Sequence, residues 1–271
     1  MGIFSKMKSK SNLSAPMPPK TRKKVGIAFG GGGIKGSAHV GVLKVLSEHN
    51  IPIDYVAGTS IGSAVAALFA SGYDWEQLDF MFTKYDVDDL IKVRPNRKGL
   101  VSADGYEDMI RTCTQGKRIE EMDIPLKIVA VDLLSRKKII FSKGDTALAV
   151  KASSAIPGVF KPVKMDNMLL VDGYILDNCP AKIVRNMGAD IVIAINLYAP
   201  DQSIPNNILD IVNRSLDIAT SSLQEIDADV LLEPISHYLP TLDPDGITQS
   251  RLWGEECALE CIDQIVKLTR G

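Results

Sequence analysis

The segment Gly58-Thr59-Ser60-Ile61-Gly62 lies between a short apolar run, residues 53–57, and a helix-forming run of small residues, 63–70. This pattern predicts a buried strand, a tight turn with Ser60 at its tip, and a helix. The two glycines remove side chains that would collide where a strand reverses sharply into a helix. The turn therefore predicts a serine hydroxyl at a sheet edge, beside the free amides and positive dipole end of the helix. Ser60 is a candidate nucleophile.

A glycine-rich loop precedes this turn. Residues 24–29 predict a buried first strand, which runs into Gly30-Gly31-Gly32-Gly33-Ile34-Lys35-Gly36 before a helix expected over 37–49. Consecutive glycines leave backbone amides free to point at one anion, such as a phosphate or the oxyanion that forms when an ester carbonyl is attacked. Ligands of parallel sheets bind at the carboxyl ends of the strands, so the loop and the serine turn predict a single site.

The same glycines also match the dinucleotide-binding pattern G-x-G-x-x-G, at Gly31, Gly33 and Gly36. That fold needs an acidic residue at the end of the second strand, whereas Asp54 stands at its start. The phosphate-binding P-loop order is also broken, because Lys35 precedes Gly36. The oxyanion interpretation is therefore favoured. Lys35 is a candidate for attracting a phosphate headgroup, with an ordinary surface lysine at the start of a helix as the alternative.

Asp172 is the candidate base. It ends an apolar strand expected over 168–171 and is followed by Gly173, whereas the Asp-Gly pairs at 104 and 245 follow no strand. His237 would complete the Ser, Asp, His order of an α/β-hydrolase, but only one strand and one helix precede the strand of Ser60. A Ser-Asp pair is thus the favoured prediction. It requires burial to raise the pKa of Asp172 above its ordinary value of about 3.9.

The remaining pattern is that of an α/β protein in which helices alternate with apolar strands. Residues 86–103 mix charges with Pro95 and Gly99, which suggests either a lid or a plain connecting loop. The strand at 189–197 is expected to lie parallel to the one before it, because a helix separates them. The other predicted elements are helices at 75–85, 106–113, 146–153, 180–187, 207–226 and 255–268, and strands at 126–133, 138–141 and 230–233.

Composition is that of one globular domain. The chain has 271 residues, 45% of them apolar, and its apolar runs are far shorter than a membrane span. Residues 25–271 are assigned to this domain, with a motif-bearing core at 25–200 and a helical part at 201–271. Residues 1–24 carry seven Lys or Arg and no acid, so they predict a disordered leader, either a solvated tail or a weak tether to anionic lipid.

The four cysteines indicate a reducing, cytoplasmic location, peripheral to a membrane if the leader binds lipid. They include no C-x-x-C pair and have no histidine at metal-ligand spacing. Cys257 and Cys261 lie four residues apart on a predicted helix. A shared core face is favoured there over a metal pair.

Four motifs together resemble the patatin-like phospholipases. They are the glycine loop at 31–36, the serine turn at 58–62, the segment Ser154-Ala155-Ile156-Pro157-Gly158-Val159-Phe160, and Asp172-Gly173, in that order and spacing. The resemblance extends over residues 25–197. Two positions depart from the family pattern: Lys35 where many members have Arg, and Tyr174 where a small residue is usual.

The resemblance implies a three-layer α/β/α fold with a mostly parallel sheet. It also implies a catalytic pair of Ser60 and Asp172, an oxyanion loop of Gly31, Gly32 and Gly33, and no metal or organic cofactor. The implied activity is hydrolysis of phospholipid or lysophospholipid acyl esters, with no role for nucleic acid. An acyltransferase using the same pair, and a non-catalytic lipid-binding protein, are the alternatives.

Overall fold

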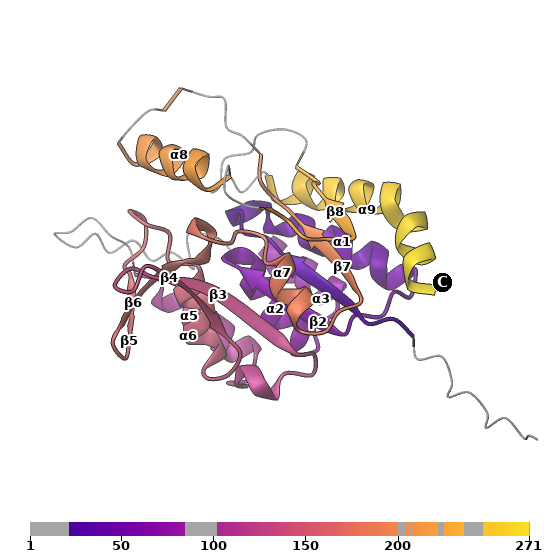
Figure 1. Cartoon of the computed structure of the whole chain (residues 1–271), viewed down its shortest axis with the longest axis horizontal. Helices are drawn as coiled ribbons and strands as arrows, with labels where there is room; N and C mark the ends of the chain where they lie inside the picture. Colours follow the sequence, from indigo (N-terminus) through magenta and orange to yellow (C-terminus); the bar gives the residue numbers. More distant parts are fainter. Residues whose placement is uncertain are drawn as a thin grey trace, which may run out of the picture.

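The computed structural model describes residues 22–84, 102–199, 204–205, 208–221, 225–235 and 246–270. These residues form one mixed sheet of eight strands in the order β5-β6-β3-β2-β1-β7-β8, with β4 also paired to β3 (Figure 1). Most of the predicted leader, residues 86–101 of the predicted lid or loop, and His237 lie outside the described residues.

Five strands run parallel to one another, and the other three are antiparallel to their neighbours. The parallel strands are β1 (Val25–Phe29), β2 (Tyr55–Thr59), β3 (Leu126–Asp132), β7 (Ile191–Ile195) and β8 (Val230–Leu232). The antiparallel strands are β4 (Lys137–Phe141), β5 (Val163–Met165) and β6 (Met168–Asp172). The prediction that the 189–197 strand runs parallel to the one before it is wrong. The hairpin of β5 and β6 turns β6 antiparallel to β3, and β7 pairs with β1 instead.

Helices cover both faces of the sheet, which confirms the predicted three-layer α/β/α class. One face carries α1 (Ser37–Glu48), α2 (Ile61–Ala70), α3 (Trp75–Lys84) and α9 (Gly246–Arg270), and the other carries α7 (Ala181–Asn186). Helices α5 (Asp104–Cys113) and α6 (Thr146–Ser153) pack on each other beside β3, and α8 (Ile208–Ser221) lies at the periphery (Figure 1). The described residues also form three short 3-10 helices, η1 (Gly33–Gly36), η2 (Ile119–Glu121) and η3 (Gly173–Ile175).

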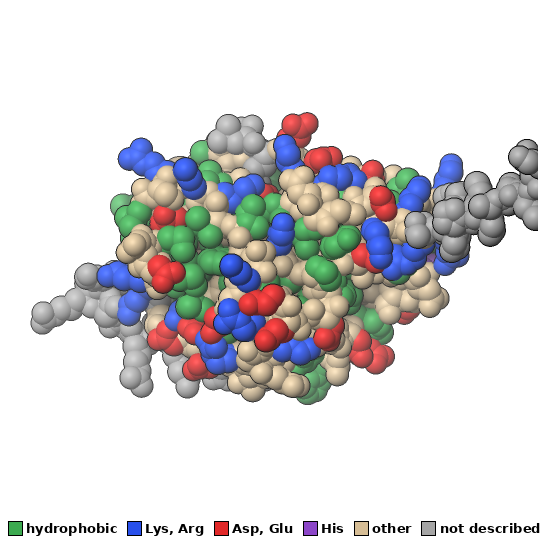
Figure 2. All heavy atoms as spheres, turned by 60° about the horizontal axis from the view of Figure 1, so that its bottom comes forward, with side chains coloured by type: hydrophobic (Ala, Val, Ile, Leu, Met, Phe, Trp, Pro, Cys, Tyr) green, Lys and Arg blue, Asp and Glu red, His purple; other side chains and the backbone are tan. Residues whose placement is uncertain are grey.

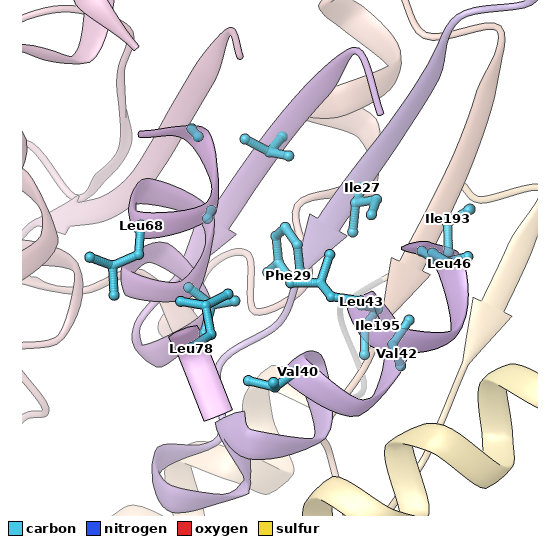
Figure 3. Close-up of a cluster of buried hydrophobic side chains, with 14 of the residues drawn as sticks. Ile27, Phe29, Val40, Val42, Leu43, Leu46, Leu68, Leu78, Ile193 and Ile195 are labelled. Carbon is cyan, nitrogen blue, oxygen red and sulfur yellow. The ribbon is translucent and has the colours of Figure 1, made fainter. Parts of the chain in front are cut away.

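The side chains of β1 are large on one face of the sheet and small on the other, which explains why the two faces hold their helices at different distances. Along β1, Val25, Ile27 and Phe29 point into the large core beneath α1 and α2, where Figure 3 shows Ile27 and Phe29 among leucines and valines of those helices. The residues between them are small. A side chain at Gly26 would collide with Val184 of α7, so this face accepts a helix at close range.

The long α9 begins nine residues before the predicted start at 255. Its early turns contain Gly254, which weakens the helix signal in the sequence. Gly254 is buried against the backbone of Ala38, and Gly41 of α1 faces the backbone of Arg251 in the same way. The two glycines thus let α1 and α9 approach backbone to backbone. Cys257 and Cys261 pack against the same core, as predicted.

We expect Gly254→Ala to destabilise the protein by about 1 to 3 kcal/mol, because the added Cβ overlaps the backbone of Ala38. Helix propensity alone predicts the opposite sign, a gain of about 1 kcal/mol. Urea unfolding followed by circular dichroism decides between them. Glu256→Ala, at an exposed position of the same helix, is the matched control and should change little. An unchanged or raised midpoint for Gly254→Ala would contradict the close helix contact.

Charged side chains of both signs are interspersed on the face turned forward in Figure 2. Ion pairs also connect α5 with α6 and its N-cap, where Lys151 contacts Asp104 and Glu107, and Arg111 contacts Asp145. Such partly exposed pairs each contribute little to stability, so the fold depends mainly on its core. None of the described helices combines the length and the apolar character that a membrane crossing requires.

Candidate active site

The strand pairing of β3 brings Ser60 and Asp172 together. Strands β2 and β4 pair with the same residues of β3, Ile128 and Val129, and therefore lie on opposite sides of it. Strand β6 pairs with Ala130 to Asp132, as β4 also does, so β6 lies on the β2 side. Along that side β2 ends opposite Val129 and β6 ends opposite Ala130. Two strands of opposite direction thus end facing each other.

The two side chains at this junction are in direct contact. Ser60 Oγ donates a hydrogen bond of 2.6 Å to Asp172 Oδ2, and the backbone N–H of Tyr174 donates to Oδ1 at 3.0 Å. Asp172 is 1% exposed and Ser60 6%. Burial raises the pKa of Asp172 to about 7, although both hydrogen bonds act in the opposite direction. A carboxyl group with this pKa is suited to accept a proton near neutral pH.

The turn at Ser60 is strained and tightly packed. Ser60 has φ 55° and ψ −129°, a conformation that non-glycine residues rarely adopt. A side chain at Gly58 would collide with the backbone of Gly62, and one at Gly62 would collide with the backbone of Phe29 and Gly30. These contacts agree with the role predicted for the two glycines. The backbone conformation is held by its surroundings, and it presents Oγ to Asp172.

Ser153, which sequence reasoning did not single out, supports the turn. Its hydroxyl accepts a 2.8 Å hydrogen bond from the backbone N–H of Ser60 and donates one of 2.6 Å to the carbonyl of Val129. Ser153 is fully buried at the end of α6. It therefore links the serine turn to β3. The signal in the sequence is only a serine beside the Ser154–Phe160 motif, and nothing in the pattern distinguishes it from its neighbour Ser154.

The glycine loop lies against the serine turn. A Cβ placed on Gly31 would lie 3.1 Å from Cβ of Ser60 and 2.6 Å from Oδ1 of Asn178. The amide of Gly31 donates to the backbone oxygen of Asn178 at 3.1 Å and to its side-chain oxygen at 3.2 Å. Asn178, also missed in the sequence, thereby anchors the loop. Gly32 and Gly33 come next in the chain, and Gly33 has a positive φ of 60°.

His39, a residue of α1, supports the glycine loop from within the core. It is fully buried, and its Nε2 lies 2.8 Å from the carbonyl oxygen of Gly30, to which a neutral ring donates. Burial lowers the pKa of His39 to about 4, so the ring stays neutral. It also packs edge-on against Phe29. His39 thus fixes the start of the glycine loop and does not contact Asp172 or Ser60 through any hydrogen bond between described residues.

Lys35 and Tyr174, the two departures from the family pattern, lie on segments that adjoin the site, η1 after the glycine loop and η3 after Asp172. Lys35 is in η1 and is 7% exposed, so it is not the surface lysine of the alternative. Tyr174 follows Asp172 in η3 and is half-buried. Burial, with Asp217 of α8 and Asp172 nearby, raises the pKa of its phenol. Among the described residues, no three His, Cys, Asp or Glu side chains are grouped to hold a metal ion.

Comparison with known proteins identifies the family. A model described as patatin-like phospholipase matches residues 27–185. An uncharacterized NTE family protein of Mycobacterium tuberculosis is 32% identical over 212 residues, which are 76% of this chain and 59% of that protein. Patatin-like phospholipase domain-containing protein 7 of Rattus norvegicus is 30% identical over 191 residues, 68% of this chain and 14% of that protein. The chain thus spans about three fifths of the first relative and a small part of the second.

A solved structure shares the fold. VipD from Legionella pneumophila superposes with a TM-score of 0.63 at 14% identity, over 90% of this chain and 67% of VipD. The low identity limits that likeness to architecture. The family model covers the glycine loop, the serine turn and Asp172, which are the parts of the chain that meet at the junction of β2 and β6. The chain belongs to the patatin-like phospholipase family.

Proposed function

We propose that this protein is a serine hydrolase that cleaves lipid acyl esters through Ser60 and Asp172. The observation that carries the proposal is the 2.6 Å hydrogen bond from Ser60 Oγ to a buried carboxyl group. A hydroxyl is a weak nucleophile until an adjacent base accepts its proton. Asp172, with a pKa of about 7, supplies such a base within hydrogen-bond reach.

In the first half of the proposed reaction, Ser60 Oγ attacks the ester carbonyl carbon while its proton passes to Asp172 Oδ2. The carbonyl oxygen becomes an oxyanion in a tetrahedral intermediate. Because the Gly31 amide already donates to Asn178, the amides of Gly32 and Gly33 are the proposed donors to this oxyanion, and Gly31 supports them. Removal of one such donor typically costs about 10²- to 10³-fold in rate.

The intermediate then expels the alcohol, which takes the proton from Asp172 and leaves an acyl ester on Ser60. Water attacks that ester with Asp172 again as base, and the fatty acid is released. These steps use only side chains, backbone amides and water. If an alcohol or thiol replaced water in the second half, the product would be a new ester. Product analysis with and without such an acceptor separates the hydrolase from the acyltransferase.

The proposed substrate is a phospholipid or lysophospholipid. The family name motivates this class, and Lys35 beside the glycine loop is the proposed group for a phosphate headgroup. The Tyr174 ring, next to the base, is expected to narrow the space for the acyl chain. The four cysteines are free, which favours a reducing, cytoplasmic location as part of the same proposal.

Fatty-acid release from a panel of phospholipids, lysophospholipids and short acyl esters tests the proposal. We expect release from at least one class, together with labelling of the protein by a fluorophosphonate probe. A folded protein that takes no probe, under conditions where a control serine hydrolase is labelled, would instead favour a non-catalytic lipid-binding protein.

We expect Ser153→Ala to lower kcat about 10- to 100-fold with little change in KM. The substitution leaves two buried backbone groups, the N–H of Ser60 and the carbonyl of Val129, without their partner, so the serine turn loses its support. Steady-state kinetics on a short acyl ester measures both constants. Ser71→Ala is the matched control, because that hydroxyl bonds only within the end of α2. Equal kcat for Ser153→Ala and wild type would show that the link is dispensable.

A further inference from the structure

Helix α8 presents an apolar stripe to solvent. Ile208, Ile211, Val212 and Ile218 are 75%, 53%, 44% and 64% exposed. At 100° per residue they fall within an arc of about 120° on one side of the helix. Thr220, on the opposite side of the helix, is buried. The stripe therefore faces away from the body of the protein.

The stripe lies at the edge of the sheet that carries the reacting groups. Helix α8 packs against η3, which begins at the residue after Asp172. Two further exposed apolar side chains, Leu176 after η3 and Tyr198 after β7, come from segments that leave the sheet at this same edge. Figure 1 shows α8 on the outside of the molecule at this end. Segments that adjoin the candidate active site thus carry exposed apolar side chains.

We propose that the outward face of α8 inserts into a phospholipid surface and holds the active site against it. This inference rests on the proposed function, since an ester with long acyl chains is presented by such a surface. The shape of the apolar stripe favours a lipid surface over a protein partner. A single projecting helix with one apolar side matches an amphipathic helix lying in the plane of a lipid interface. A stable protein partner usually needs a broader surface, of about 800 Å² per partner.

Charge indicates which lipid surface is suitable. The sequence of α8 contains one arginine and two aspartates, so the helix offers no net positive charge to anionic headgroups. Binding through α8 is therefore expected to depend on apolar insertion, and to occur on zwitterionic phosphatidylcholine at high salt. This distinguishes it from any binding by the basic residues 1–24, which needs anionic lipid and is screened by salt.

Vesicle sedimentation with the Ser60→Ala protein tests the proposal without requiring catalysis. We expect this protein to bind phosphatidylcholine vesicles in about 0.5 M salt. At this ionic strength the attraction between charges on the protein and on the lipid surface is largely screened. Adding Ile208→Asp and Ile211→Asp should lower the vesicle partition coefficient at least about 10-fold, since two charges then face the acyl region. Leu259→Asp, at a 51% exposed position of α9, is the matched control and should bind like the parent.

Two further measurements separate a loss of vesicle binding from misfolding and from a loss of catalysis. Circular dichroism and urea midpoints should be equal for the α8 variants and the parent, because the changed side chains face solvent. When Ser60 is retained, the same α8 variants should cleave a soluble short-chain ester at the rate of the wild type. They should cleave a substrate held in vesicles more slowly than the wild type does. If no ester is cleaved by any form but vesicle binding still depends on α8, the proposed function fails and the docking surface stands.

Three results would overturn the docking surface. One is equal vesicle binding by the α8 variants and the parent. Another is binding that occurs only on vesicles with anionic phosphatidylglycerol and disappears at high salt, which would assign it to residues 1–24. The third is a dimer in sedimentation velocity that Ile211→Asp dissociates, which would make the stripe a contact with a second copy of this chain.

Discussion

Ser60→Ala is expected to abolish acyl ester hydrolysis, with a loss of at least about 10³-fold in kcat. The substitution removes the one atom proposed to form the acyl-enzyme. It leaves the backbone in place, because the amide of residue 60 still donates to Ser153 and the glycines around it are unchanged. Steady-state release of fatty acid from a lysophospholipid and from a short acyl ester measures the loss.

Covalent labelling adds a readout independent of turnover. The wild type should gain one fluorophosphonate adduct by intact mass, located on the peptide that contains Ser60, and the Ser60→Ala protein should gain none. Ser71→Ala, eleven residues further on in the same strand-turn-helix unit, is the control and should be labelled and active. Substantial activity in Ser60→Ala would remove the proposed nucleophile, since no other hydroxyl contacts Asp172 among the hydrogen bonds of the described residues.

The sequence predicted the two proposed reacting groups because each one ends a strand in a distinctive turn. Ser60 stands between two glycines that the backbone contacts require, and Asp172 follows an apolar run. Their supports were not predictable in the same way. Ser153 bonds to the Ser60 amide across 93 residues of chain, and Asn178 bonds to Gly31 across 147. Isolated polar residues of this kind carry no periodic or local signal.

The strands, too, divide into those that the sequence predicts and those that it does not. Long apolar runs identified β1, β2, β3 and β7, but the three-residue β5 has only one buried side chain and was missed. Without β5 the chain appeared to continue as parallel units, so the direction of β6 could not be inferred. That direction has chemical importance: only an antiparallel β6 can end opposite the end of β2 along β3. The predicted meeting of Ser60 and Asp172 at one sheet edge therefore occurs by a different geometry.

Asp172→Asn is expected to lower kcat/KM by about 10³-fold, because the amide cannot accept the proton of Ser60. The geometry should survive, since an Asn can still accept from the Tyr174 amide through its oxygen and donate to Ser60 through its nitrogen. In the wild type, kcat/KM should rise tenfold per pH unit below about 7 and level off above it, as Asp172 loses its proton. The variant's small residual activity should lack that rise. A wild-type profile that is flat from pH 5 to 8 would exclude Asp172 as the base.

Stability should change with pH in the opposite sense to activity. A carboxyl group whose pKa is raised by folding, here from 3.8 to about 7, stabilises the fold below its unfolded pKa. That contribution is lost as the pH rises toward 7, because the folded state must then hold a buried charge. The Asn variant does not titrate, so its free energy of unfolding relative to wild type should increase by about 2 to 3 kcal/mol between pH 5 and pH 8. Urea unfolding at the two pH values measures this difference, and groups common to both proteins cancel.

A constant difference would mean that burial does not raise the pKa of Asp172. An increase would show that the base is kept at a cost in stability, which a purely structural carboxylate would not explain.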